Sequence, residues 1–236
     1  MTTIDLDALG PAGDRRYCLA RPGGRVFTQR DDPSLARLQA QISDDGLRLD
    51  LDGATLEVRA ADFTRETLLR VWSRDATARL ARDDVNAVAT RWFGTPLQLA
   101  RLERPVVRQN AALALGDAAA LLLTNTASLD ALNASLDAPV PMTRFRPNIV
   151  LDGAAAYGED HWRRLRVGDA ILAPVHACGR CEVTTIDQEF GAVVGDEPLR
   201  TLSRLRMQEG EAVFGVRYAV EQRGTIRVGD AAATLD

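Results

Sequence analysis

The stretch GLRLDLDGATLEVRA, residues 46–60, alternates apolar and polar side chains with a period of two. Asp52-Gly53 interrupts the alternation, and Asp-Gly is a strong signal for a two-residue hairpin turn. The apolar positions on the two sides of that turn are Leu47, Leu49, Leu51, Leu56 and Val58. A period of two places these side chains on one face of a pair of strands, so the segment predicts a hairpin with one buried face. A chain that contains this segment must build a sheet.

Two further segments predict a second hairpin and a helix. RRYCLARPGGRVFTQR, residues 15–30, has two apolar runs around Pro22-Gly23-Gly24, which is typical of a hairpin turn. DDVNAVATRWFG changes to helical spacing, with Asp83 or Asp84 as the predicted N-cap and Gly94 as the predicted end.

The second half of the chain also favours strands. PLQLARLE (96–103) and Leu121–Leu123 are predicted strands, and Ser128 is predicted to open a helix. LRVGDAIL (165–172) and IRVGDAAATL (226–235) share Val-Gly-Asp, which predicts two similar hairpin turns. The predicted fold class is β-rich α+β with a few short helices.

Composition limits the functions open to this fold. The 236 residues carry a formal charge of -4 and a pI of about 5.3, which argues against an extended nucleic-acid surface. There is no apolar run of the length of a membrane span, and the N-terminus lacks the basic-then-apolar order of a signal peptide. Three cysteines cannot close a disulfide framework, so we predict a cytoplasmic protein with reduced thiols and no membrane or nucleic-acid partner.

Two of the three cysteines lie in HACGRCEVTTID, residues 176–187. A structural zinc site needs four ligands, so beside His176 and the two cysteines it would have to recruit Cys18 or His161 from a distant segment, or use a carboxylate. A redox dithiol needs Cys-x-x-Cys at a helix N-terminus, whereas the residues after Cys181 are β-branched and favour a strand. Two inert buried thiols, or one thiolate that binds a soft metal, are the other interpretations, and all four stay open on this pattern alone.

A second candidate region is VPMTRFRPNIVLDG, residues 140–153. Pro147 disfavours a helix at the residue before it, so an extended segment is predicted here. Arg144 and Arg146 would then point to the same side and could grip a phosphate. Thr143 precedes them and Asn148 follows them closely, which favours ligand contact over a pair of solvated arginines.

At these residues the chain resembles the MOSC family, in the branch that contains the mitochondrial amidoxime reducing component and its bacterial relatives. The resemblance spans nearly the whole chain, in family order. The matching blocks are GDRRYCLARPGGRVFTQRDDPSLA, PVPMTRFRPNIVLDG, YGEDHWRRLRVGDAILAPVHACGRCEVTTID, EPLRTLSRLR and FGVRYAVEQRGTIRVGD. It implies an N-terminal β-barrel-like domain over residues 1–95, packed against a MOSC β-barrel domain over residues 96–236, with a pyranopterin molybdenum cofactor held between them.

The resemblance also implies roles for single residues. Cys181, the second cysteine of CGRC, falls at the position of the molybdenum ligand and is therefore the candidate catalytic residue. Arg15, Arg146 and Asn148 fall where the family contacts the cofactor. The neighbouring motif positions, which complete the predicted cofactor-binding set, are Thr143, Arg144 and Arg180.

The implied activity is a molybdenum-dependent reduction of small N-hydroxylated compounds. Because a [2Fe–2S] cluster needs four cysteines, the electrons are expected from an external donor protein of the ferredoxin or flavoprotein type. The alternatives are a non-catalytic carrier of the cofactor or of sulfur, and a scaffold variant that has lost the cofactor. At the level of the family, the resemblance also extends to pyridoxal phosphate binding.

One departure from the family concerns lysine. Family members usually begin with a strand that carries a Tyr-Pro-x-Lys-Ser type motif, whose lysine helps to hold the cofactor. This chain begins MTTIDLDALGPAGDRR, lacks that first strand, and contains no lysine; all 29 of its basic residues are arginine. A misplaced start, a natural truncation and an altered cofactor site are three explanations. We expect an exposed sheet edge and weak cofactor binding if the strand is truly absent.

Overall fold

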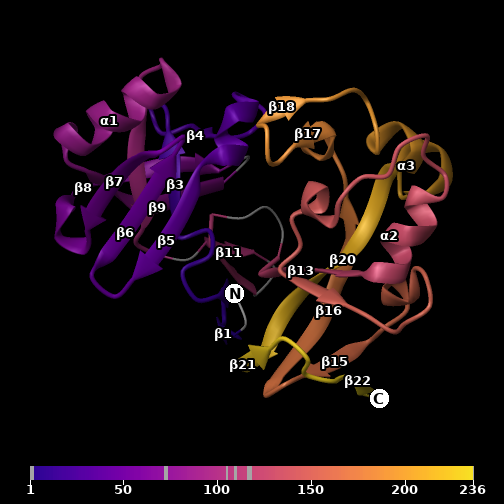
Figure 1. Ribbon diagram of the computed structural model, residues 1–236. Coiled ribbons are helices and arrows are strands. Elements are labelled where there is room, and N and C mark those ends of the chain that lie inside the picture. The colour runs from indigo at the N-terminus through magenta and orange to yellow at the C-terminus, as the bar shows by residue number, and fades with distance from the viewer. Residues whose placement is uncertain (1–2, 72–73, 105, 109–110, 116–118, 236) are drawn as a thin grey trace. The chain divides into compact units, whose positions relative to one another are not determined.

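The structure is a computed structural model that describes residues 3–71, 74–104, 106–108, 111–115 and 119–235 (Figure 1). The chain forms two compact units. Unit 1 comprises Met1–Ala12, Ala118–Ile186 and Val193–Asp236, and unit 2 comprises Gly13–Asp117 and Asp187–Ala192. Both are built mainly from antiparallel strands, so the predicted β-rich α+β class is confirmed. The predicted domain ranges, 1–95 and 96–236, stay a prediction.

Unit 1 contains most of the strands of the second half of the chain. Its strands are β1 (Thr3–Asp7), β2 (Gly10–Pro11), β13 (Leu121–Asn125), β14 (Ile149–Leu151), β15 (Arg164–Val167), β16 (Ala170–Gly179), β19 (Met207–Gln208), β20 (Glu211–Gln222), β21 (Gly224–Arg227) and β22 (Ala232–Leu235). Its helices are α2 (Thr126–Asn133), α3 (Leu199–Leu205) and the 3-10 turns η3 (Met142–Phe145), η4 (Gly158–Asp160) and η5 (Glu182–Thr185). The short strands β17 (Ile186–Asp187) and β18 (Ala192–Val193) pair with each other.

The largest sheet of unit 1 has the strand order β14-β13-β20-β16-β15-β22, with β19 paired to β20. Its two long strands, β16 and β20, lie side by side and antiparallel, in orange and yellow in Figure 1. The core on this sheet is built around Leu121, Leu123, Leu172 and Tyr218, each at most 1% exposed. The predicted buried strand at Leu121–Leu123 is thereby confirmed. Within the described residues, no helix is long and apolar enough to cross a membrane.

The strands on the two sides of each Val-Gly-Asp segment pair differently in the two cases. In the first, β15 and β16 form the predicted hairpin, with Leu165 opposite Leu172. In the second, β21 pairs with β1 and β22 pairs with β15, so the predicted hairpin is wrong. Both glycines have a positive φ, because the shared residues specify only a local turn. Which strands then pair depends on what covers their apolar side chains; Ile226 lies opposite Ile4 in the core.

Helix α2 begins earlier than predicted. Asn125 is its N-cap, and its side chain accepts a hydrogen bond from the Ala127 N–H at 3.2 Å. Ser128, the predicted start, lies within the first turn and is fully buried. Its hydroxyl donates to Glu159 at 2.8 Å and accepts from the Tyr157 N–H at 2.7 Å. The serine therefore fastens the segment around η4 to the helix instead of capping it.

The described residues of unit 2 form three sheets and one α-helix. Its strands are β3 (Tyr17–Ala20), β4 (Val26–Phe27), β5 (Gln39–Ser43), β6 (Gly46–Leu51), β7 (Ala54–Arg59), β8 (Phe63–Val71), β9 (Arg74–Ala81), β10 (Gln98–Leu102), β11 (Val106–Arg108) and β12 (Ala111–Leu113). Its helices are α1 (Asp83–Phe93) and the 3-10 turns η1 (Pro33–Arg37) and η2 (Ala60–Asp62). The sheets have the orders β4-β3-β10-β9-β8 and β5-β6-β7, while β11 pairs with β12.

Two predicted hairpins are confirmed in unit 2. Strands β6 and β7 form the Asp52-Gly53 hairpin, and both turn residues have the positive φ that a type I′ turn requires. Strands β3 and β4 form the hairpin at Pro22-Gly23-Gly24. The first of these hairpins buries Leu47, Leu49 and Val58 against α1 and the larger sheet. Each such side chain contributes about 1.5–3 kcal/mol when fully removed from water.

Helix α1 occupies the predicted segment, but its predicted N-cap is wrong. The N-cap is Arg82, which makes no side-chain capping bond, while Asp83 and Asp84 lie in the first turn. There, their carboxylates interact favourably with the positive end of the helix dipole. Gly94 ends the helix in the left-handed conformation, as predicted.

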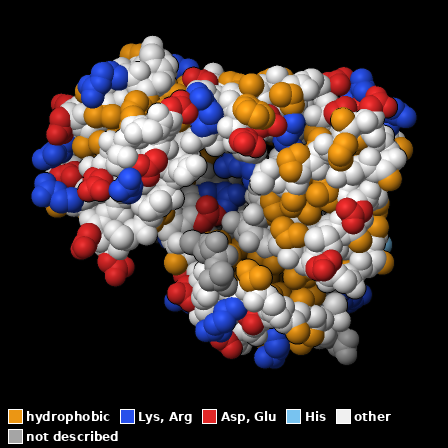
Figure 2. All heavy atoms as spheres, viewed as in Figure 1, with side chains coloured by type: hydrophobic (Ala, Val, Ile, Leu, Met, Phe, Trp, Pro, Cys, Tyr) orange, Lys and Arg blue, Asp and Glu red, His pale blue; other side chains and the backbone are white. Residues whose placement is uncertain are grey.

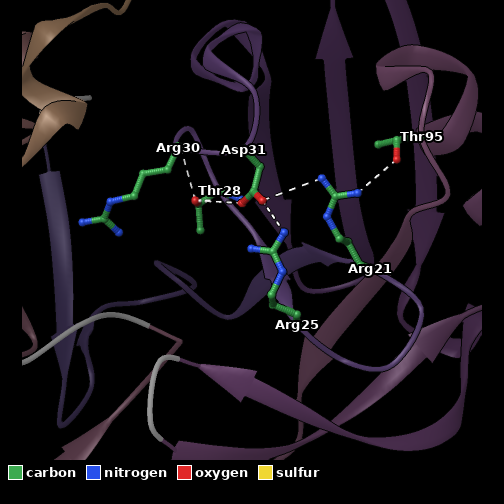
Figure 3. A network of polar contacts seen from close by, with 6 residues as sticks. All are labelled: Arg21, Arg25, Thr28, Arg30, Asp31 and Thr95. Carbon is green, nitrogen blue, oxygen red and sulfur yellow. Dashed lines mark hydrogen bonds and ion pairs between the residues drawn. The ribbon is translucent and has the colours of Figure 1, made fainter.

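Arginines and acidic side chains are interspersed over unit 2 on the face shown in Figure 2. One group of these contacts surrounds Asp31, whose side chain is 10% exposed (Figure 3). Its carboxylate accepts from the Thr28 N–H at 2.9 Å, pairs with Arg25, and lies 3.7 Å from the Arg21 guanidinium. Arg21 in turn donates to Thr95 at 3.1 Å. Burial pushes the pKa of Asp31 upward, but the hydrogen bonds from Arg25 and Thr28 outweigh burial and hold it below its ordinary value.

We expect Asp31→Asn to lower the thermal midpoint of the protein, with a loss on the order of 1–2 kcal/mol from the hydrogen bonds. Because the folded pKa is depressed, the stabilisation is present above the unfolded pKa of about 4 and is lost as the pH falls through the folded value. The difference between wild type and variant should therefore shrink below about pH 4. Calorimetry from pH 7 to pH 3 measures this. The control is Asp84→Asn, which removes a carboxylate that is 68% exposed; equal midpoint shifts in the two variants would contradict the expectation.

Candidate functional site

The two neighbouring cysteines lie at the end of β16 in unit 1 and differ in exposure. Cys178 lies within the strand and is 0% exposed. Cys181 immediately precedes η5, is half-buried, and is not part of a disulfide. Its carbonyl oxygen accepts from the Thr184 N–H at 3.0 Å and from the Thr184 hydroxyl at 2.9 Å. The main chain of Cys181 is thereby fixed while its side chain stays accessible.

The Arg144–Arg146 segment is not extended, so that prediction is wrong. Residues 142–145 form η3, and the Arg146 N–H closes this turn on the Thr143 carbonyl at 3.1 Å. Arg146 then adopts a left-handed conformation with φ 53°, because Pro147 disfavours a right-handed helical one. The two arginines consequently do not share a face. Arg144 is buried at 6% exposure, whereas Thr143 and Arg146 are exposed.

Two arginine side chains tie η3 to the cysteine segment. Arg144 Nη1 donates to the Thr184 carbonyl at 3.2 Å, and Arg180 Nη2 donates to the Phe145 carbonyl at 2.9 Å. The Arg180 guanidinium also lies 5.3 Å from the centre of the Phe145 ring, and its Nη1 donates to Cys178 Sγ at 3.0 Å. Phe145 and Thr184 were missed by sequence reasoning, because no local pattern links residues some forty positions apart.

Asn148 is held by the neighbouring strand. Its N–H donates to the Leu122 carbonyl at 2.8 Å, and its side-chain oxygen accepts from the Leu122 N–H at 2.9 Å. Phe145 anchors the same turn by stacking on Phe214, with ring centres 4.0 Å apart. Unit 1 therefore brings the predicted residues Arg144, Arg180 and Cys181 into one hydrogen-bonded region, with the exposed residues Thr143 and Arg146 on its turn.

Arg15, the remaining predicted residue, lies in unit 2. Its carbonyl accepts from the Leu115 N–H at 2.9 Å, and its side chain forms an ion pair with Asp14. Like Arg146, it has a positive φ; the described non-glycine residues with that property are Arg15, Asp52, Arg146, Tyr157 and Glu209. Backbone strain of this kind tends to occur at functional positions.

The alternative interpretations of the cysteines find little support. The described residues contain no group of three or more His, Cys, Asp and Glu side chains that could hold a metal, so a zinc site has no ligand set among them. Cys181 precedes a four-residue 3-10 turn and not an α-helix, so the helix dipole expected of a redox dithiol is missing. Cys18 belongs to unit 2, and burial raises the pKa of its thiol to about 12, which keeps it protonated at neutral pH.

A strand-rich unit that presents one accessible cysteine beside an arginine-bearing turn is the arrangement expected of a MOSC domain. The comparisons with family models agree. Residues 110–233 match the model "MOSC domain", and residues 1–97 match "MOSC N-terminal beta barrel domain". The chain belongs to the MOSC family, as the sequence resemblance implied.

Proteins similar to this chain carry a common name. Mitochondrial amidoxime-reducing component 1 of the mouse is 31% identical over 94% of this chain and 72% of its own length. The human protein of that name is 30% identical, with the same shares covered, and cattle mitochondrial amidoxime reducing component 2 is 29% identical over 94% of this chain and 73% of its own length. The predicted branch of the family is thereby confirmed.

Solved structures add little. YiiM from Geobacillus stearothermophilus is 14% identical, covers 74% of this chain and 73% of its own, and has a TM-score of 0.39. A Bordetella bronchiseptica protein solved in solution is 17% identical, covers 37% of this chain and 72% of its own, and has a TM-score of 0.31. These similarities are too low to support a conclusion.

We expect iodoacetamide to modify Cys181 first in folded protein expressed in a host that makes no molybdenum cofactor. Cys178 is 0% exposed, and Cys18, with a pKa of about 12, has only about one thiolate in ten thousand at pH 8. Peptide mapping by mass spectrometry gives the rate at each position. Cys181→Ser should abolish the fast reaction, and all three thiols should react after unfolding in urea. Equal rates for Cys178 and Cys181 in the folded protein would contradict the geometry.

Proposed function

We propose that this chain is a molybdenum-cofactor-dependent reductase of N-hydroxylated compounds, supplied with electrons by an external protein. The observation that carries the proposal is the half-buried Cys181 thiol, tied through Arg180 to a turn that exposes Arg146. A thiolate suits a redox-active transition metal, and an exposed guanidinium suits a phosphate. The similar proteins named amidoxime-reducing components support the reaction class.

The residues of this region fit the chemistry of a pyranopterin cofactor. Cys181 offers one soft donor, and Arg146 offers charge without being buried. Arg180 Nε is buried and has no acceptor among the described residues, so this donor would be better satisfied beside an added anionic group. We therefore assign Cys181 as the metal ligand, and Arg146 and Asn148 as contacts of the pterin phosphate. The proposed set is completed by Arg15, Thr143, Arg144 and Arg180.

When bound, the cofactor supplies a metal centre that exchanges two electrons. The net reaction takes R–NHOH, two electrons and two protons to R–NH2 and water. Cys181 must lose its thiol proton to serve as a ligand, so cofactor binding releases a proton there. Arg146 and Asn148 orient the group through charge-assisted and neutral hydrogen bonds. Arg144 and Arg180 act behind them, by holding the turn and the cysteine segment together.

The electrons and the cellular setting belong to the same proposal. Three cysteines are too few for a [2Fe–2S] cluster, so a donor protein of the ferredoxin or flavoprotein type is required. A cytoplasmic location is proposed, because none of the three cysteines forms a disulfide. Pyridoxal phosphate binding finds no support, because that cofactor forms a Schiff base with lysine and the sequence has none.

A carrier of cofactor or sulfur without turnover, or a scaffold without the cofactor, is the second candidate. The observation that favours it is the absence of lysine, since the family motif Tyr-Pro-x-Lys-Ser contributes a lysine to the cofactor. Metal analysis of freshly purified protein separates a scaffold from the other two. If molybdenum is bound, reduction of benzamidoxime with a chemical electron donor separates the reductase from the carrier.

We expect Cys181→Ser to abolish molybdenum retention and benzamidoxime reduction while leaving the fold intact, because one thiol contributes little to core packing. Molybdenum per chain, measured by mass spectrometry with inductively coupled plasma, and circular dichroism test this. The matched variant Cys178→Ser should retain metal, since that buried cysteine is assigned no metal bond. Equal loss in both variants, together with stoichiometric zinc, would instead support a Cys-x-x-Cys metal site.

Arg146→Ala should weaken cofactor binding by roughly ten- to a hundred-fold, the equivalent of one charge-assisted hydrogen bond of about 1.5–3 kcal/mol. Cofactor released by heating and oxidised to its fluorescent pterin measures occupancy. The control is Arg166→Ala, which removes an exposed guanidinium from β15 of the same unit. If both variants keep the occupancy of the wild type, Arg146 is not a phosphate contact.

A further inference from the structure

The two histidines of the chain line a single cleft in unit 1. His161 and Trp162 follow η4, and His176 belongs to β16. The cleft has a volume of about 340 Å³, which is within the range of small-molecule pockets. No residue assigned to the cofactor lines it.

An irregularity in β16 shapes this cleft. Pro174 lies opposite Tyr218 of β20 and His176 lies opposite Arg217, so Val175 is an extra residue on the β16 side. Proline cannot donate a ladder hydrogen bond, and a bulge is where an inner strand tolerates it. The bulge leaves Val175 45% exposed and places His176 at the surface of the cleft. Bulges are common beside binding sites, where they redirect side chains.

The charges around the cleft favour an anion. Arg163 lines it and has no acidic partner in the part of the chain that the structure describes. The one lining carboxylate, Asp160, is ion-paired with Arg206, whose guanidinium lies 4.0 Å from the centre of the Tyr157 ring. The cleft is therefore lined by a guanidinium and two imidazoles, and the charge of its carboxylate, Asp160, is balanced by Arg206.

The other lining residues are the ring-bearing Trp162 and Pro174, the apolar Val175, Ala177 and Val216, and the polar Gln208. The Trp162 indole and the Pro174 ring both line the cleft, and flat faces of this kind favour stacking of a planar ring. His176 Nδ1 lies 2.7 Å from the Ala177 carbonyl, so this nitrogen is the ring's donor to the main chain. Its Nε2 is then the atom left to meet a ligand.

We propose that this cleft is a second ligand site, which binds a small planar aromatic carboxylate. The ring packs between Trp162 and Pro174, and the carboxylate accepts hydrogen bonds from the Arg163 guanidinium and a ring N–H of His161, and from His176 Nε2 when that imidazole is protonated. The inference is independent of the cofactor site, because none of its residues belongs to the set around Cys181.

Benzoate is the probe, and the full chain as purified is the sample. Because the chain has two histidines, its imidazole C–H proton resonances can be assigned with His161→Gln and His176→Gln. Benzoate titration should shift both resonances, and calorimetry should give saturable binding. Benzamide, which has the same shape without the charge, should bind at least about ten-fold more weakly. Unshifted resonances, or equal affinity for the two probes, would overturn the proposal.

Variants locate the site. Arg163→Ala should weaken benzoate binding at least about ten-fold, while Arg166→Ala, an exposed arginine on β15 outside the cleft, should leave it unchanged. Cys181→Ser should also bind benzoate as the wild type does. Loss of binding in Cys181→Ser with retention in Arg163→Ala would place benzoate at the cofactor site and overturn the inference, whatever the molybdenum content proves to be.

Discussion

The candidate site depends on two guanidinium groups that bond to main-chain carbonyls across unit 1. Arg144 of η3 donates to the Thr184 carbonyl, and Arg180 of the cysteine segment donates to the Phe145 carbonyl. Each segment therefore bonds to the main chain of the other through an arginine. Without these bonds, nothing in the local sequence would hold the turn of Arg146 against the segment of Cys181. A planar guanidinium suits this task, because it can donate in several fixed directions while stacking on a ring, which an ammonium group cannot do.

This arrangement changes the assignment of the predicted arginines. The sequence resemblance placed Arg144, Arg146 and Arg180 together as cofactor contacts. In the structure, Arg144 is buried, and two N–H groups of Arg180 donate to Cys178 Sγ and to the Phe145 carbonyl. Only Arg146 combines a motif position with exposure and a strained backbone. We therefore propose that Arg146 meets the ligand directly, and that Arg144 and Arg180 position the site in addition to their place in the proposed set.

The sequence predicted those elements whose signals are local. The alternation around Asp52-Gly53 and the helical spacing before Gly94 both depend on neighbours within a few residues, and both appear as expected. The extended Arg144–Arg146 segment was wrong because a distant contact, the stack of Phe145 on Phe214, determines that turn. The hairpin predicted at the second Val-Gly-Asp segment was wrong for a similar reason, because β21 pairs with β1, at the other end of the chain. The family motifs predicted Cys181 as the metal ligand. They could not show that the Thr184 hydroxyl donates a hydrogen bond to the Cys181 carbonyl and so fixes its main chain.

Irregular pairing along β16 connects these observations. Its ladder with β20 changes register at three places, two of which lie between Pro174 and His176 and between Ala177 and Gly179. Of these two, the first opens the histidine cleft, and the second precedes Cys181. A regular strand would alternate its side chains strictly between two faces, so it could not aim both groups this way within so few residues. The pair β16–β20 lies at the centre of the sheet, and these two of its three register changes lie beside the residues that we propose for binding.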